Sequence, residues 1–339
     1  MEQIDSKRGA GLIDIHCHMA GIGAGGSGCF VSQRLRRNFR YHFYLKAFGI
    51  TEAELLEAGD GLVLQRISQG LSLSRRVSLA VILALDGVAA DNGDLDETAT
   101  EMYIPNGFVA RKVRCHPNLL FGASINPFRS DPLRRLEEVV ADGAVLLKWL
   151  PPIQHIDPAD RRLIPFYLRV KELGLPLLSH AGSEHSFSRA RNEFGDPERL
   201  RLPLSLGVTV IAAHAAGSGR NHGESNFERL LRLQEYPNFY VDISALTQIN
   251  RPGQLRRLLR CRELHGRLLY GTDMPLVNSC LVSPWAFPLR LSLRQMLAIS
   301  RMHNPWDRDL ALKEALGMRP EMLATASTIL KIPAMGVTG

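Results

Sequence analysis

The sequence has few cysteines and no paired arrangement of them. Its five cysteines are Cys17, Cys29, Cys115, Cys261 and Cys280, an odd number of widely spaced residues without a C-x-x-C pair. This usage argues against a disulfide framework and against a zinc-finger pattern, and it favours reduced thiols inside the cell. We therefore expect a cytoplasmic protein.

Long hydrophobic runs are also lacking. Runs such as Leu79 to Leu85 are far shorter than the roughly 20 apolar residues that a membrane-spanning helix needs. The first residues, Met1 to Arg8, are largely polar and contain no apolar core of signal-peptide length. We expect a soluble protein with no membrane partner.

Recognisable nucleic-acid-binding modules are missing as well. The glycine-rich run Gly21 to Gly28 lacks the Gly-Lys-Ser/Thr ending of a phosphate-binding P-loop, so we expect a flexible lid or rim there. Lysine plus arginine at 41 against aspartate plus glutamate at 34 give a net charge of +7. Without a basic-aromatic module this charge predicts no nucleic-acid partner, but a modest preference for anionic small molecules.

What is present is enough for one large domain covering residues 1–339. Hydrophobic residues make up 45% and charged residues 22% of the chain, which are ordinary values for a globular protein with a full core. A single α/β barrel typically needs about 250 residues, so 339 residues leave room for insertions.

Short apolar runs alternate with segments of helical periodicity along the chain. The predicted strands are Leu12 to His16, Val77 to Leu85, Leu120 to Ile125, Ala144 to Trp149, Leu175 to His180, Val208 to His214, Phe239 to Ile243 and Leu268 to Asp273. Nearly continuous apolar strands separated by helix-sized crossovers indicate a parallel sheet that is buried on both faces. We predict an α/β fold, a (β/α)₈ TIM barrel with insertions after strands 1 and 2 and extra C-terminal helices; an open doubly wound sheet is the alternative.

The first strand ends in two histidines one residue apart. Because successive strand side chains point to opposite faces, His16 and His18 share a face, while Cys17 points away from it. His180, His214 and Asp273 end later strands, and the carboxyl ends of barrel strands share one rim. Imidazole and carboxylate donors suit a divalent transition metal, zinc first and manganese second. The predicted ligands are His16, His18, His180 and Asp273.

These residues form an ordered set of motifs. His16-Cys-His18, Lys148, His180-Ala-Gly, His214-Ala and Gly271-Thr-Asp-Met-Pro275 resemble the amidohydrolase superfamily, in particular its amidohydrolase-related (amidohydrolase 2) branch of metal-dependent TIM-barrel hydrolases and decarboxylases. The resemblance covers nearly the whole chain. In the closing helix Thr325 stands where that branch usually has asparagine.

The resemblance implies one or two metal ions at the mouth of the barrel. A carboxylated Lys148, together with His214, would ligate a second ion. Asp273 would take a proton from metal-activated water, and His214, if not a ligand, would donate a hydrogen bond to the developing oxyanion or act as acid and base. Asp14 and Asp242 are candidates to orient ligating imidazoles.

Six further side chains are candidates for substrate binding. An unmodified Lys148 would need an anionic partner, which a substrate carboxylate could supply. The basic and aromatic segment after the first strand brings arginines that could meet the same carboxylate. The candidates are Lys148, Arg36, Arg37, Arg40, Gln154 and Glu184.

The predicted function is a metal-dependent hydrolase that cleaves an amide, lactone or related C–N or C–O bond of a small, carboxylated molecule. The alternative is non-oxidative decarboxylation of an aromatic or unsaturated acid at the same metal. A non-catalytic metal-binding barrel is the least favoured hypothesis, since both Asp273 and His214 are present. Association into a homo-oligomer stays open.

Overall fold

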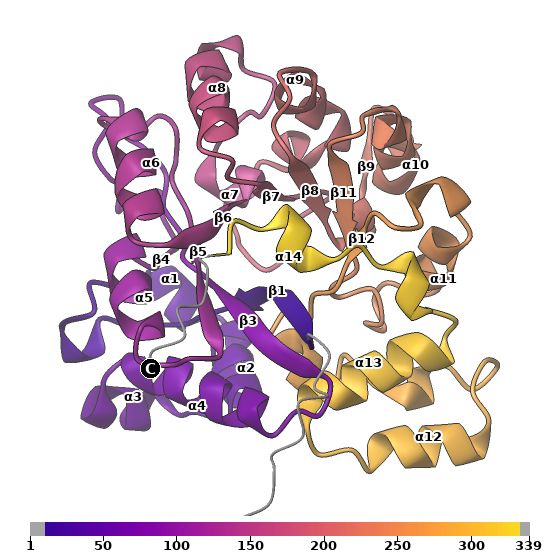
Figure 1. The fold of residues 1–339 in the computed structure, drawn as a ribbon. Helices are drawn as coiled ribbons and strands as arrows, with labels where there is room; N and C mark the ends of the chain where they lie inside the picture. Colours follow the sequence, from indigo (N-terminus) through magenta and orange to yellow (C-terminus); the bar gives the residue numbers. More distant parts are fainter. Residues whose placement is uncertain (1–10, 333–339) are drawn as a thin grey trace, which may run out of the picture.

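The computed structural model describes residues 11–332, so the polar segment Met1 to Arg8 lies outside the described residues (Figure 1). Its main sheet has eight parallel strands in the order of the chain, which confirms the predicted TIM barrel. The strands are β1 (Leu12–His18), β3 (Val77–Leu83), β5 (Leu119–Ala123), β6 (Ala144–Trp149), β7 (Leu177–His180), β8 (Val210–Ala213), β11 (Phe239–Asp242) and β12 (Leu268–Leu269).

The barrel closes between its first and last strands. The amide of Ile15 donates to the carbonyl of Tyr270 at 3.1 Å, and the amide of His18 donates to the carbonyl of Met274 at 3.0 Å. Strand β12 is shorter than predicted, because residues beyond Leu269 reach β1 through these separate bonds rather than through a regular ladder. Closure places the carboxyl ends of β1 and β12 side by side.

Apolar side chains fill the barrel from inside and cover it from outside. The interior holds Ile15, Leu83, Leu146 and Leu178 among other buried residues, whereas a larger cluster lies between the strands and the helices. Burial on both faces explains why the strands read as continuous apolar runs. Helix α14 (Ala326–Ile329) packs against the interior cluster and covers the amino-terminal end of the strands (Figure 1).

The helices follow the crossovers that the periodicity predicts, with trimmed ends. They are α4 (Gly61–Ser72), α5 (Asn106–Val113), α6 (Pro132–Ala141), α8 (Ile164–Glu172), α9 (Arg201–Ser205), α10 (Asn226–Leu231), α11 (Gln254–Leu259), α12 (Leu293–Ser300) and α13 (Pro305–Ala315). Helix α6 is strongly amphipathic and begins with proline at its first turn, where the missing amide hydrogen costs no intrahelical bond. Among the described residues, none of the helices has the length and apolar character required to cross a bilayer.

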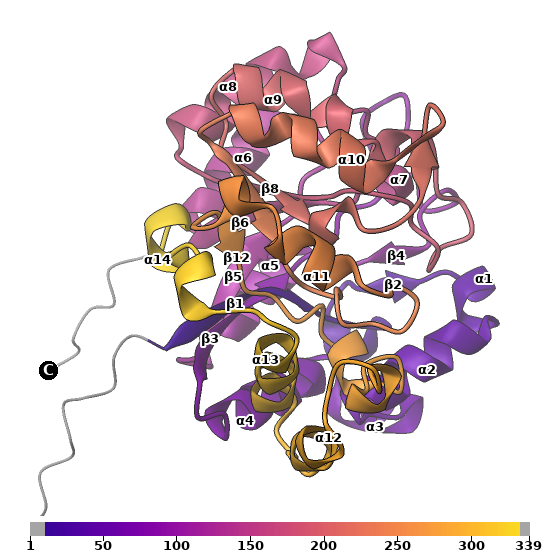
Figure 2. The same cartoon turned by 90° about the vertical axis from the view of Figure 1, so that its right-hand side faces the viewer.

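The insertions after the first two strands build the mouth. The first contains α1 (Gln33–Arg36), α2 (Phe39–Phe48) and α3 (Glu52–Ala58), and its short strand β2 (Phe30–Val31) pairs with β4 (Met102–Tyr103) of the second insertion. Figure 2 shows this pair and α1 at the end of the barrel opposite α14. The run from Gly21 to Gly28 includes a single 3₁₀ turn, Ala24–Gly26, and is otherwise irregular.

Candidate metal centre

Strand β1 presents His16 and His18 to the mouth together. The strand carries a register shift against β3 between Asp14 and Cys17, a bulge of the kind that redirects side chains near functional sites. The two Nε2 atoms lie 3.1 Å apart, and Cys17 packs into the apolar cluster outside the barrel. The alternation expected from the sequence therefore holds at these three residues.

Asp273 joins the two histidines from the far side of the barrel seam. Its Oδ1 lies 3.7 Å from His16 Nε2 and 3.3 Å from His18 Nε2. Bonds of about 2.1 Å to a tetrahedral ion place its donors roughly 3.4 Å apart. The three donor atoms therefore have the spacing that a divalent metal requires.

The Asp273 backbone and carboxyl group are both unusual. Its φ of 62° lies in the left-handed region, which costs a non-glycine residue free energy, and its amide donates to the His16 carbonyl at 2.9 Å. Burial alone would raise the pKa of this carboxyl group, but His214 and the bond to His18 hold it well below its usual value. Asp273 is therefore ionised at neutral pH.

His180, at the end of β7, is a fourth potential donor. Its Nε2 is buried and has no hydrogen-bond partner among the described residues, while Nδ1 lies 3.9 Å from Glu184 Oε2. Burial lowers the pKa of His180 to about 4, although the charge of Glu184 opposes this shift. A neutral imidazole with an unpartnered buried nitrogen is what a ligating histidine offers before its ion arrives.

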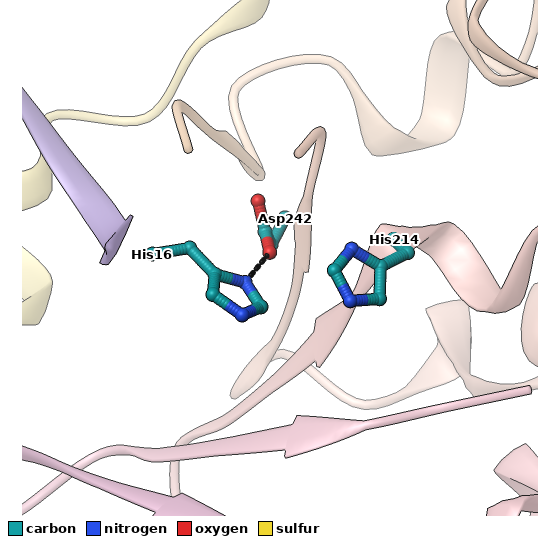
Figure 3. A group of neighbouring side chains, drawn as sticks. All are labelled: His16, His214 and Asp242. Atoms are coloured by element: carbon teal, nitrogen blue, oxygen red, sulfur yellow. Dashed lines mark hydrogen bonds and ion pairs between the residues drawn. The ribbon is translucent and has the colours of Figure 1, made fainter. Parts of the chain in front are cut away.

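A carboxylate and a hydroxyl hold the imidazoles of His16 and His214 from behind. Figure 3 shows the Asp242 carboxylate against the His16 ring, with His214 beside it. Asp242 Oδ2, at the end of β11, lies 2.6 Å from His16 Nδ1, and the Ser244 hydroxyl donates to the same oxygen at 2.6 Å. Because the Nδ1–H of His16 donates to Asp242, the Nε2 lone pair of His16 faces the mouth. Asp242 thus makes the contact expected of a residue that orients the His16 imidazole.

His214 follows β8 in a strained backbone. His214, Ala215 and Ala216 all have positive φ angles, 56°, 47° and 48°, which side-chain-bearing residues rarely adopt in succession. Its Nδ1 lies 2.8 Å from Ser244 Oγ, and its ring stacks on that of His16 with 4.9 Å between centroids. Burial lowers the pKa of His214 well below its ordinary value, despite the opposing charge of Asp273. The imidazole is therefore neutral at pH 7.

Lys148 reaches the same cluster from β6. Its Nζ lies 3.0 Å from His16 Nε2, so the lysine and a metal ion would use the same nitrogen lone pair. Burial lowers the pKa of Lys148 to about 8, against the attraction of Asp242 and Asp273. Burial and the Lys148 charge also lower the pKa of His16 well below its usual range. A metal at His16 therefore requires Lys148 to release this nitrogen.

Two of the side chains predicted to bind substrate, Gln154 and Glu184, have hydrogen-bond partners within the protein. Gln154 is buried, and its side chain accepts from the Leu150 amide at 2.6 Å and donates to the Asp86 carbonyl and the Ser124 hydroxyl. Glu184 lies beside His180, although one of its oxygens accepts from the Ser186 amide.

The three arginines of the first insertion that were predicted to bind substrate have different surroundings from one another. Arg36 binds Glu52 at 3.2 Å and the Ile22 carbonyl at 3.1 Å, and Arg40 donates to the His185 carbonyl. Arg37 is exposed. Arg36 thus joins parts of the first insertion to one another, and Arg40 joins this insertion to the loop after β7.

Sequence reasoning missed three side chains at the mouth. They are Ser244, Tyr44 and Arg251, none of which ends a strand. Burial, together with the charges of Glu184 and Asp273, raises the pKa of Tyr44. The chemical signal for Ser244 was its spacing of two residues from Asp242; nothing in the sequence distinguishes Arg251 from its arginine neighbours.

Comparison with known proteins identifies a family for most of the chain. Residues 13–300 match the amidohydrolase family. No curated protein matches the chain.

Three solved structures illustrate the likeness. An uncharacterised TIM-barrel protein from Bordetella bronchiseptica is 18% identical, covers 89% of this chain and 99% of its own, and has a TM-score of 0.54. A probable 2-pyrone-4,6-dicarboxylic acid hydrolase from Acinetobacter baumannii, solved with citric acid bound, is 13% identical, covers 94% and 97%, and has a TM-score of 0.52. The 5-carboxyvanillate decarboxylase LigW from Sphingomonas paucimobilis is 12% identical, covers 96% and 100%, and has a TM-score of 0.46.

The family match spans most of the described barrel, from β1 through α12, and includes every residue of the His and Asp cluster. The chain therefore belongs to the amidohydrolase family.

Proposed function

We propose that the protein is a metal-dependent hydrolase acting on a small carboxylated molecule. The observation that supports this proposal most is the spacing of three donor atoms, from His16, His18 and Asp273, within 3.7 Å of one another. These residues, with His180 as the fourth donor, would hold a divalent transition metal, for which zinc is our first choice. His214 and a carboxylated Lys148 are the candidates for a second ion.

The ion would supply Lewis acidity, which polarises a carbonyl group and lets water ionise near neutral pH. The protein's own residues would then handle the proton. Asp273 is ionised and can accept a proton at its carboxylate and return it to the leaving group. Because the Ser244 hydroxyl donates to Asp242, it accepts from the Nδ1–H of neutral His214, which leaves the Nε2 lone pair of His214 to accept a proton as a base.

An apolar hollow of about 40 Å³ adjoins the segment that follows β1. Its walls include Ile22, Tyr41, Tyr44 and Phe187. Because these side chains come from the segment after β1, from α2 and from the loop after β7, the insertion after the first strand determines much of its shape. A hollow of this size would take a small apolar group of a substrate and not a whole aromatic ring.

Removing metal tests the proposal directly. We expect a purified preparation to contain at least one zinc or manganese ion per chain, and chelation followed by dialysis to abolish hydrolysis of a lactone and amide panel. Readdition of the ion should restore it. Metal analysis and intact mass are measured on the same sample; two ions with an added carbon dioxide would identify carboxylated Lys148.

Two outcomes would contradict the hydrolase. Release of carbon dioxide from aromatic acids, without ring opening of any lactone, would show a decarboxylase instead. A correctly metallated preparation that is inert toward both bond types would support the non-catalytic barrel.

Asp242→Asn should weaken metal binding without removing a ligand. Losing the charge behind His16 Nδ1 removes the preference for the tautomer with a free Nε2, and changes of this kind cost about 10- to 100-fold in metal affinity. Competition with a chromophoric chelator measures the affinity. Asp91→Asn, an exposed carboxylate in the second insertion, is the control and should leave the affinity unchanged.

A further inference from the structure

We propose that Arg251 binds the carboxylate of the substrate and thereby sets the specificity of this site for acids. The proposal rests on the proposed function, because it assigns a substrate class to the same mouth. It also places the anion-binding arginine in the loop after β11 rather than in the segment from Arg34 to Lys46, where the sequence suggested it.

The guanidinium of Arg251 is enclosed but has no partner. Its Nη1 is buried without a hydrogen bond, and among residues 11–332 its side chain makes no ion pair with any carboxylate. The side chain as a whole is half-buried. An enclosed, unpaired charge is unfavourable, and an incoming anion would relieve that cost.

The loop that carries Arg251 packs against the metal-binding cluster. It includes Ser244, whose hydroxyl lies 2.8 Å from His214 Nδ1. Leu246 and Gln254, on either side of Arg251 in the chain, pack beside Gly217, three residues after His214. In keeping with this placement, the charge of Arg251 contributes to the lowered pKa of both His180 and His214. A substrate whose carboxylate meets Arg251 would therefore bring its neighbouring atoms toward His180 and Asp273.

Both nearby carboxylates already have other partners. Asp273 Oδ1 lies against His16 and His18, and Glu184 Oε1 accepts from the Ser186 amide at 2.5 Å. Arg36 is bound within the first insertion, and Arg40 donates to the His185 carbonyl in the loop after β7. Arg251 is thus the arginine at this mouth whose donors are available to a ligand.

The backbone around Arg251 is held in place. Its amide donates to the Gln248 carbonyl at 2.9 Å, the Ile249 amide donates to the Leu281 carbonyl at 2.9 Å, and Gln248 forms a bridge with Val282. These bonds join the loop to the segment that follows β12. A fixed arginine with a planar set of donors matches the two oxygens of a carboxylate better than a lysine would.

Calorimetry with a paired set of probes tests the proposal. Benzoate and its uncharged analogue benzamide are titrated into the metal-loaded wild-type protein, Arg251→Met and Arg256→Met. Arg256 is exposed on the following helix, which makes it a matched control. We expect Arg251→Met to weaken benzoate about 10- to 100-fold, the loss typical of a charge-assisted hydrogen bond, with benzamide unchanged and Arg256→Met like wild type.

Each other outcome supports or contradicts the proposal that Arg251 binds the substrate carboxylate. Equal benzoate affinity in wild type and Arg251→Met, or no benzoate binding by wild type, would overturn it. If Arg251→Met fails to fold, Arg251→Lys serves instead, because it keeps the positive charge without the planar pair of guanidinium donors. This variant should bind benzoate with intermediate affinity. Wild-type affinity for benzoate in Arg251→Lys would contradict a bidentate contact. Metal content is measured on every sample. Failure of the wild type to bind metal would refute the proposed function, and the same benzoate comparison on the metal-free proteins would still test Arg251.

Discussion

Replacing Asp273 by asparagine is expected to lower kcat/KM by about 10²- to 10⁴-fold, the range that a positioned proton acceptor contributes. The carboxylate is buried, ionised and within 3.7 Å of both strand-one histidines. Asparagine keeps an oxygen at a similar position but cannot accept a proton at neutral pH. The measurement is kcat/KM at saturating metal on the best substrate of the panel.

Two comparisons separate proton transfer from simple loss of a ligand. If Asp273 serves only as a ligand, excess metal should restore the activity of Asp273→Asn to near the wild-type level, which would contradict the proposed role. Glu184→Gln changes a neighbouring carboxylate whose Oε2 lies 3.9 Å from His180 Nδ1, and should reduce kcat/KM less. An equal loss in both variants would show that the charge of the mouth matters and not the position of Asp273.

Much of the barrel follows from local rules in the sequence. Strands buried on both faces need continuous apolar residues, so runs such as Ala144 to Trp149 mark the sheet without further information. Strand and helix ends are less determined, because they depend on contacts between distant residues. The predicted strand from Leu268 to Asp273 ends at Leu269, since the following residues bond across the seam to β1.

The candidate metal donors could be predicted for a related reason. Parallel strands bring their carboxyl ends to one rim, so His16, His18 and Asp273 meet although Asp273 is far away in the chain, and the His180 ring lies 5.3 Å from that of His214. Arg251 could not be predicted in this way, because it lies on an irregular loop and several other arginines follow it closely in the chain. Its significance depends on burial and on the missing partner, which only three-dimensional packing reveals.

A second buried network, away from the mouth, secures the segment that carries Asp273. Lys313 of α13 is fully buried, contacts Asp309 one turn earlier, and donates to the Gly271 carbonyl at 3.1 Å. The Tyr270 hydroxyl donates to the same Asp309 carboxylate at 3.1 Å. Trp306, at the start of the helix, donates to Asp14 at 2.9 Å. Helix α13 thus contacts both strands at the seam of the barrel.

Lys313→Met is expected to reduce the free energy of unfolding by about 3–5 kcal/mol, because it leaves the Asp309 carboxylate buried without its counterion. Urea titration followed by circular dichroism measures the loss. The double variant Lys313→Met with Asp309→Leu removes both charges and should recover most of the stability, since a packed apolar pair can replace a buried ion pair at little cost.

If the double variant is no more stable than Lys313→Met, the pair does not act as a unit, and the bond from Lys313 to Gly271 would account for the loss by itself. In that case α13 would directly support the backbone at Gly271, two residues before Asp273. Loss of the bond from Lys313 to Gly271 should then lower the metal affinity of both variants equally.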